Sequence, residues 1–500
     1  MTLYSLLAPV KYISHSPRQL LAGSWAALAF LCAFLVAGPS SSYAQSELPE
    51  LGNRTSGLVS TDKEYELGRA WLRSLRSQVP TLEDPLILDY IRDLAYRLAP
   101  NSQLEDPRLE FVVVDSNSLN AFAVPGGIIG INGGLFLHAQ SEGQFASVVA
   151  HELAHLSQRH FARRLERNQR NQPLAMAGLL ASLIVAAAAG GDAGMAALAT
   201  SQAYNLQQQL NYSRENEQEA DRIGIATLAA SGIDPRAMPA MFESMMRSNR
   251  FGQHVPEYLR THPLSQSRVS DARNRAEQYP PRAYREDVEY YFMKSRVMLH
   301  YAESSEAART IFKSIMDSND SQSTRGAQYG YVLASIKTGK LEDAERELDK
   351  LIKLYPNRIS ILILQAELLE AQGKQSESLA LLAKHYERNP GNNPLGQTYA
   401  ASLIRAGQDQ EAERILQTLA QETPNNPYLW RSLSEVQGRL GNIVAVHQAQ
   451  AEYLFLTNDV EAALNQLQQA LRKSSGSFQQ NALIQKRLDD FFRAKEGFKF

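Results

Sequence analysis

The chain has 500 residues, of which 44% are apolar, and a formal net charge of −2 at pH 7. A chain of this length exceeds what one hydrophobic core usually supports, so we expect two or three domains. The near-neutral charge and the lack of a long basic run in the sequence argue against nucleic-acid binding.

Residues 1–44 are typical of a secretory signal peptide. Two basic residues precede an uncharged, apolar stretch at residues 19–42, and Ser42-Tyr43-Ala44 supplies small residues at the two positions that a signal peptidase reads. We expect cleavage after Ala44 and export to a bacterial periplasm. An uncleaved membrane anchor is the alternative, because the apolar run is long for a signal. The single cysteine, Cys32, lies here, so the mature chain would have no thiolate ligand and no disulfide.

Helices and short strands are predicted next, after a polar linker at residues 45–60. Apolar periodicity predicts one helix from Asp62 to about Leu75 and a second over residues 85–98. Residues 109–114 predict a strand, and residues 120–136 predict two more, bent at Pro125-Gly126-Gly127. The proline and glycines favour an edge strand or a bulge. Such a strand would either pack beneath the helices or pair with an extended substrate.

A helix predicted over residues 144–166 carries the motif His-Glu-x-x-His. His151 and His155 are one turn apart and project from the same face, so both imidazoles could bind one zinc ion. Glu152 lies beside them, where it could take a proton from a metal-bound water. The apolar residues of this helix give it a buried side, which a rigid site requires; they are Phe145, Val148, Val149, Leu153 and Leu156. The motif therefore predicts metal-assisted hydrolysis.

Residues 174–200 are almost wholly apolar, with an interruption at Gly190-Gly191-Asp192. The first apolar run ends at residue 189 and is shorter than the ~20 residues that a helical membrane span needs. Two buried, alanine-rich helices are therefore favoured, and peripheral membrane contact or a membrane-embedded peptidase is the alternative.

A polar helix predicted over residues 202–230 supplies carboxylates that could complete a metal site. Glu217 and Asp221 are one turn apart on one helical face. An exported chain without cysteine is a natural setting for a zinc site built from histidine and carboxylate ligands.

Three further polar residues near these motifs are predicted to face solvent. Glu215 and Glu219 are each two residues from Glu217 and therefore point elsewhere on a helix. His160 follows His151 by nine residues, which on a continuous helix places it near the opposite side. We therefore expect none of the three to bind the metal.

The sequence becomes repetitive from about residue 285 onward. Glycines recur every 34 residues, and prolines recur with the same period: Gly339, Gly373, Gly407 and Gly441, with Pro356, Pro390 and Pro424. An amphipathic segment separates each glycine from the next proline, which is the pattern of tetratricopeptide repeats. Three repeats are clear, a degenerate one precedes them at residues 290–323, and the register drifts after Gly441, where Asn458 begins another amphipathic segment.

Together these motifs resemble the HtpX-like and CAAX-prenyl-protease-like zinc endopeptidases. His-Glu-x-x-His is followed, in residues 213–224, by Ser-Arg-x-x-Glu-x-x-Ala-Asp-x-x-Gly, and residues 120–127 match the edge-strand segment of that family. The resemblance implies that Glu217 is the third zinc ligand and that Asp221 supports the ligands. It also favours substrate alignment as the role of the edge strand.

The signal peptide and the repeats make the chain similar to periplasmic members of this family, over nearly the whole mature chain. Thr261-His262-Pro263-Leu264 matches a segment whose histidine can occupy the open position of the metal. The resemblance implies that His262 is a self-inhibiting fourth ligand or a transition-state stabiliser. Without the resemblance, the plainer interpretation of His262 is a loop histidine before a proline. It further implies unfolded or misassembled outer-membrane proteins as substrates, and the barrel-assembly machinery as a partner of the repeat domain.

We therefore predict an α+β fold. A mostly helical, gluzincin-type metallopeptidase domain with a small β-sheet, residues 61–283, precedes an all-α tetratricopeptide-repeat solenoid, residues 284–500. Such a solenoid suits protein recognition. The predicted function is that of a periplasmic endopeptidase with a chaperone-like role in outer-membrane protein assembly and quality control, and the predicted cofactor is one Zn²⁺ per chain. The alternative is a chaperone or scaffold whose zinc site is inactive, although Glu152 argues against a purely structural site.

Overall fold

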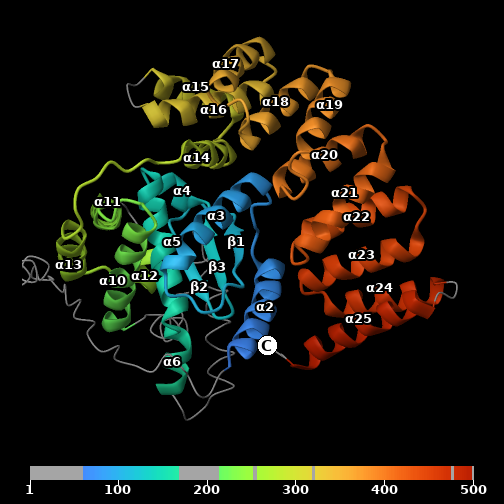
Figure 1. The fold of residues 1–500 in the computed structure, drawn as a ribbon, viewed down its shortest axis with the longest axis horizontal. Helices are drawn as coiled ribbons and strands as arrows, with labels where there is room; N and C mark the ends of the chain where they lie inside the picture. Colours follow the sequence, from blue (N-terminus) through green and yellow to red (C-terminus); the bar gives the residue numbers. More distant parts are fainter. Residues whose placement is uncertain (1–59, 168–212, 252–255, 318–320, 475–477, 498–500) are drawn as a thin grey trace, which may run out of the picture. The chain divides into compact units, whose positions relative to one another are not determined.

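The computed structural model describes residues 60–167, 213–251, 256–317, 321–474 and 478–497 (Figure 1). These residues belong to one compact unit, Arg54–Phe500. The described part is mostly helical with one small sheet, as the sequence predicts. None of its helices combines the length and the apolar character needed to cross a membrane. The predicted signal peptide, most of the linker and the apolar segment 174–200 lie outside the described residues.

The sheet has three strands, β1 (Glu110–Val114), β2 (Ala121–Val124) and β3 (Ile128–Asn132), in the order β1-β3-β2. β3 pairs parallel with β1 and antiparallel with β2, which confirms that β2 is an edge strand. The turn between β2 and β3 contains Gly126 and Gly127, at φ of +80° and +77°. A Cβ on Gly126 would lie 2.3 Å from the backbone oxygen of Glu64, so both the backbone conformation and the space require glycine.

Two helices precede and cover the sheet. α2 (Thr61–Gln78) begins at Ser60, whose hydroxyl accepts a hydrogen bond from the Lys63 amide. α3 (Pro85–Leu98) begins after Asp84, whose carboxylate accepts from the amides of Leu86 and Ile87, and Pro85 occupies the first turn. The apolar face of α3 packs against β1 and the motif helix.

The motif helix is shorter than the sequence predicts. In place of one helix over residues 144–166, the structure has α5 (Glu142–Ser157) and α6 (His160–Arg167), with the short helix α4 (Gly134–His138) before them. Arg159 lies between α5 and α6 at φ +48°, a left-handed conformation that non-glycine residues rarely adopt. The chain therefore turns immediately after His-Glu-x-x-His.

The described residues between 213 and 283 form the helices α10 (Arg214–Ala230), α11 (Ala237–Phe251), α12 (Tyr258–Thr261) and α13 (Gln266–Glu277). α5 contacts β2 on one side and α10 and α11 on the other (Figure 1). α10 approaches α5 closely at Gly224, where a Cβ would lie 2.8 Å from Met238 Cε and 3.4 Å from the backbone nitrogen of His151. This approach brings the acidic residues of α10 to the histidines of α5.

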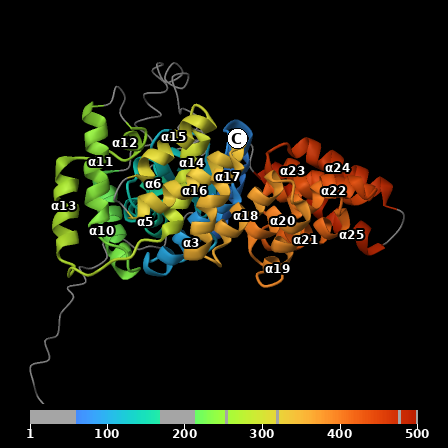
Figure 2. The same cartoon turned by 90° about the horizontal axis from the view of Figure 1, so that it is seen from above.

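The remaining helices form the predicted repeat series, and consecutive helices lie side by side in both views (Figure 1 and Figure 2). Their bounds are α14 (Val288–His300), α15 (Ser305–Met316), α16 (Ser321–Lys337), α17 (Leu341–Leu354), α18 (Ile359–Ala371), α19 (Gln375–Tyr386), α20 (Asn393–Arg405), α21 (Asp409–Glu422), α22 (Pro427–Arg439), α23 (Ile443–Leu456), α24 (Val460–Lys473) and α25 (Phe478–Gly497). The four periodic glycines follow α16, α18, α20 and α22 at φ of +70° to +76°. Asn458 takes the same conformation after α23, at φ +70°, where the sequence register drifts.

Several repeat helices contact the first half of the chain. α14 packs against α3 and α4, α20 packs against α3, and α23 packs against α2. Near the start of α22, the Tyr428 hydroxyl lies 2.7 Å from Thr81 Oγ1, and Asn425 Nδ2 donates to Glu110 Oε2 at 3.0 Å. The repeats are thus packed onto the part that contains the metal motif.

Candidate metal centre

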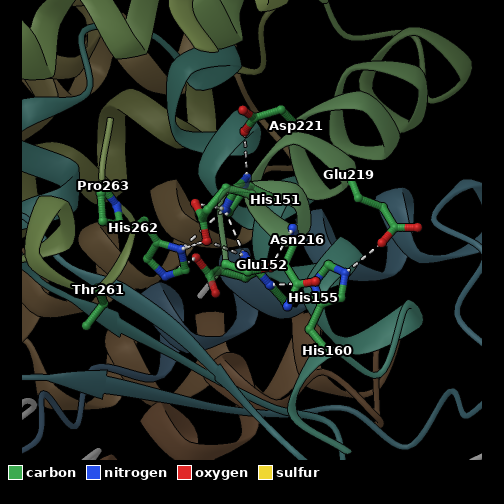
Figure 3. A network of polar contacts seen from close by, with 12 residues as sticks. His151, Glu152, His155, His160, Asn216, Glu219, Asp221, Thr261, His262 and Pro263 are labelled. Carbon is green, nitrogen blue, oxygen red and sulfur yellow. Dashed lines mark hydrogen bonds and ion pairs between the residues drawn. The ribbon is translucent and has the colours of Figure 1, made fainter. Parts of the chain in front are cut away.

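Four buried side chains from three separate segments converge at one point. His151 and His155 project from α5, Glu217 from α10, and His262 directly follows α12; Figure 3 shows the three histidines grouped around Glu152. With one ligand atom from each residue, these atoms all lie within 4.8 Å of one another. None of the four residues is more than 3% exposed.

The distances among these atoms fit a metal ion better than a network of hydrogen bonds. The Nε2 atoms of His151 and His155 face each other at 3.0 Å, and His262 Nδ1 lies 3.4 Å from His151 Nε2. The Glu217 carboxylate lies 3.5 Å from both Nε2 atoms and 3.1 Å from His262 Nδ1. Three imidazole nitrogens and one carboxylate that share a single centre are a donor set suited to Zn²⁺.

Glu152 is next to this group and is itself fully buried. Neither of its oxygens has a hydrogen-bond partner among the described residues, and His262 Nε2 lies 3.5 Å from Oε1. Burial raises the pKa of the Glu152 carboxyl, although His262 and His151 oppose this shift. The Glu152 carboxylate thus lies buried beside the four converging residues, with His262 as its ion-pair neighbour.

Polar residues around the four converging side chains hold them in place. Asp221 Oδ1 lies 3.0 Å from His151 Nδ1, as Figure 3 shows. Arg268, on α13, donates to both oxygens of Asp221 at 2.8 Å, and its Nη1 lies 2.8 Å from Glu217 Oε2. Burial alone would raise the pKa of Asp221, but the Arg268 and His151 contacts lower it overall. The sequence alone predicts no role for Arg268; its one signal is its position shortly after His262.

The position of His160 contradicts the prediction that this residue faces solvent. It is fully buried, not solvent-facing, and its Nδ1 lies 2.8 Å from His155 Nδ1. Its other nitrogen, Nε2, lies 3.1 Å from Glu219 Oε2 (Figure 3). The prediction assumed one continuous helix, whereas the turn at Arg159 directs His160 back toward the motif. Helical periodicity contains no signal for this break.

Glu219 corrects a second prediction, because it is half-buried and paired instead of solvated. Arg163 Nη2 lies 3.0 Å from Glu219 Oε2, the same oxygen that faces His160. The hydrogen bond from His160 and the pairing with Arg163 lower the pKa of Glu219 to about 2, against the opposing effect of burial. Glu215, by contrast, is exposed as predicted.

The segment around His262 is anchored to the rest of the site. The His262 amide donates to the Tyr258 carbonyl at 2.8 Å, and the two rings stack at a centroid distance of 4.6 Å. The Tyr258 amide in turn donates to the carbonyl of Leu119, just before β2. His262 is therefore held within the ligand group by the fold of its own segment.

A cleft begins beside His155 and follows the end of the edge strand. Its lining includes Ala123 of β2, Pro125 of the following turn, and Phe161. Of the four converging residues, His155 is the one that contributes to this lining, so the cleft connects the edge strand with one side of the buried group.

Comparisons with known proteins match both halves of the chain. Residues 88–276 match the model of Peptidase family M48, and residues 369–436 match a tetratricopeptide-repeat model. The beta-barrel assembly-enhancing protease of Escherichia coli O157:H7 is 33% identical over 453 residues, which cover 90% of this chain and 92% of that protein. The protein of the same name from Yersinia pestis is 31% identical over 478 residues, covering 94% and 98%. The mitochondrial metalloendopeptidase OMA1 of Arabidopsis thaliana is 34% identical over 170 residues, covering 34% and 32%.

Proposed function

Because the chain belongs to peptidase family M48 and groups there with the beta-barrel assembly-enhancing proteases, we propose that this metalloendopeptidase is a periplasmic zinc enzyme that cleaves misassembled outer-membrane proteins. The observation that carries the proposal is the convergence of three imidazoles and a carboxylate beside the fully buried Glu152. The sequence pattern before Ala44 supports export, with cleavage after that residue.

We assign His151, His155 and Glu217 as the zinc ligands, with His262 at the fourth position. Zinc, when bound, supplies a Lewis acid for the scissile carbonyl and acidifies a water. Glu152 accepts the proton of the attacking water and returns it to the leaving amine.

The surrounding residues keep this machinery in position. Asp221 orients the His151 ring through Nδ1. Arg268 holds the carboxylates of both Asp221 and Glu217.

The substrate is an extended segment of polypeptide. Among the described strands, β2 has a neighbour on one side only, in the order β1-β3-β2, and residues at its end line the cleft beside His155. A strand added to this edge would gain backbone hydrogen bonds without a requirement for one sequence, which suits an enzyme for unfolded proteins. The repeat helices recruit such clients or the barrel-assembly machinery, since stacked repeats provide protein-binding surfaces.

Metal removal tests the proposal directly. We expect a chelator to abolish cleavage of casein, used as an unfolded protein, by the purified mature chain, and one equivalent of Zn²⁺ to restore it. Metal analysis and a gel-based cleavage assay measure both effects. Full cleavage by a chain shown to be metal-free would contradict the proposal.

The buried position of His262 supports a second candidate function, in which the chain is a chaperone or scaffold whose site is closed. The two functions are compatible when His262 acts as a self-inhibiting ligand that substrate displaces. We propose this role for His262, because its imidazole occupies the ligand group and also approaches Glu152.

We expect His262→Ala to raise the rate of casein cleavage about tenfold, the gain expected when a competent state populated at ~10% becomes the main state. Initial rates at matched zinc content measure this effect. His300→Ala, at an exposed histidine outside the site, is the control and should leave the rate unchanged. A lower kcat for His262→Ala would instead identify His262 as a transition-state stabiliser.

A further inference from the structure

His155, His160 and Glu219 form a chain of contacts that leads away from the ligand group. His155 faces the other ligands with Nε2 and faces His160 with Nδ1, at 2.8 Å from His160 Nδ1. His160 uses its second nitrogen to contact Glu219, at 3.1 Å. Every nitrogen of the two rings therefore has a defined neighbour (Figure 3).

The carboxylate at the end of this chain determines where the protons lie. An ionised carboxylate accepts hydrogen bonds and donates none, so Nε2 of His160 must carry a proton. A neutral imidazole has one N–H, which leaves Nδ1 of His160 as an acceptor. The 2.8 Å contact then requires His155 Nδ1 to be the donor. The lone pair of His155 is consequently on Nε2, the atom that faces the other ligands.

The other histidine of the motif, His151, contacts a carboxylate in a different way. Nδ1 of His151 faces the carboxylate of Asp221 directly, at 3.0 Å. Nδ1 of His155 instead faces the His160 ring, which lies between it and Glu219. Each motif histidine is thus connected to a carboxylate of α10, one directly and the other through a second imidazole.

The backbone that places His160 is strained, and ion pairs hold it. Arg159 keeps φ at +48°, a conformation of a kind that costs about 1–3 kcal/mol and persists where the surroundings enforce it. The Arg159 side chain is fixed to Glu64 of α2 at 3.0 Å, and Arg163 is fixed to Glu219 at 3.0 Å. The turn after α5 is therefore maintained in the form that buries His160 under His155.

We propose that His160 and Glu219 are positioning residues of the metal centre, which fix the tautomer and the ring orientation of His155 toward the metal. This inference rests on the proposed function, in which His155 is a metal ligand. Partners that hold the second nitrogen of a ligand histidine typically contribute 10–100-fold to metal affinity. The role of His160 is to connect Nδ1 of His155 to the carboxylate of Glu219.

The test measures the zinc dissociation constant of the full mature chain by competition with a chromophoric chelator. We expect His160→Phe, which keeps a ring but removes the acceptor, to weaken zinc binding about 10–100-fold. His160→Gln supplies an amide oxygen that can accept from His155 Nδ1 and should recover part of this loss. Glu219→Gln should weaken binding to an intermediate degree. Glu215→Gln, the same change at an exposed position of α10, should leave affinity unchanged.

Two further measurements separate positioning from a general effect on folding. The melting temperature of the zinc-free protein should fall in Glu219→Gln, because the pair with Arg163 is lost, so it is measured beside zinc affinity; kcat should fall more than KM rises. Zinc affinity within twofold of wild type in both His160→Phe and Glu219→Gln would overturn the inference. The inference would also be overturned if His160→Phe and His160→Gln lost equal amounts of zinc affinity and the melting temperature of the zinc-free protein fell in both. Wild type that binds zinc no better than His155→Ala would overturn the proposed function itself.

Discussion

Glu152→Gln is expected to lower the rate of casein cleavage by about 10²–10⁴-fold while the zinc content remains at the wild-type level. Glutamine has nearly the same shape as glutamate but cannot accept the proton of the attacking water. Glu152 is not one of the four residues of the ligand group, so its replacement leaves the metal ligands intact. Steady-state cleavage rates and metal analysis of the same preparation measure the two quantities.

The matched control for this change is Glu277→Gln, an identical substitution at an exposed position of α13. It should cleave casein at the wild-type rate. Cleavage by Glu152→Gln at the wild-type rate would contradict the assignment of the base. Loss of zinc from Glu152→Gln would show that Glu152 contributes to binding the metal.

Arg268→Met is expected to lower the free energy of unfolding of the zinc-free protein by about 3–5 kcal/mol. Arg268 is 3% exposed and contacts two carboxylates that are equally buried, those of Asp221 and Glu217. Its removal leaves these charges in a low-dielectric environment without their cation, which costs more than the lost contacts themselves. Urea unfolding followed by circular dichroism measures the difference.

Arg273→Met provides the control, because Arg273 lies on the same helix but is 56% exposed, and its carboxylate partner Glu243 is 36% exposed. This exposed pair should contribute less than about 1 kcal/mol. In the double variant Arg268→Met, Asp221→Asn, part of the stability should return, since one unpaired charge is removed with the cation. Equal unfolding free energies for Arg268→Met and Arg273→Met would contradict the structural role of Arg268.

Local signals predict much of the fold correctly. Asp84 and Pro85 mark the start of α3, and its bounds agree with the periodicity of its apolar residues. The glycines that recur every 34 residues mark helix ends because they take positive φ. This effect needs no contact outside the repeat that contains the glycine. The spacing of His151 and His155 likewise predicts that both rings share one face of α5. In each case, the sequence information and its structural effect lie within one helical turn or one repeat.

Other features depend on contacts between distant segments, and the sequence pattern does not contain them. The end of α5 is set by the turn at Arg159, which an ion pair with Glu64 of α2 maintains. The burial of His160 follows from this turn, and the pairing of Glu219 follows from the burial of His160. Periodicity treats residues 144–166 as one helix and therefore misplaces both side chains. The role of Arg268 is hidden for the same reason, since its partners are on α10.

The distribution of the ligands along the chain has a consequence for the order of events in folding. His151 and His262 are separated by 111 residues, and Glu217 comes from a third segment. α5 can form early with two ligands and the base, but the complete centre requires long-range packing, which is slow compared with helix formation. A partly folded copy therefore has no competent centre, although its own exposed segments are of the class that the finished enzyme cleaves. Under the proposed function, an unfinished copy therefore cannot cleave another copy before its own long-range packing is complete.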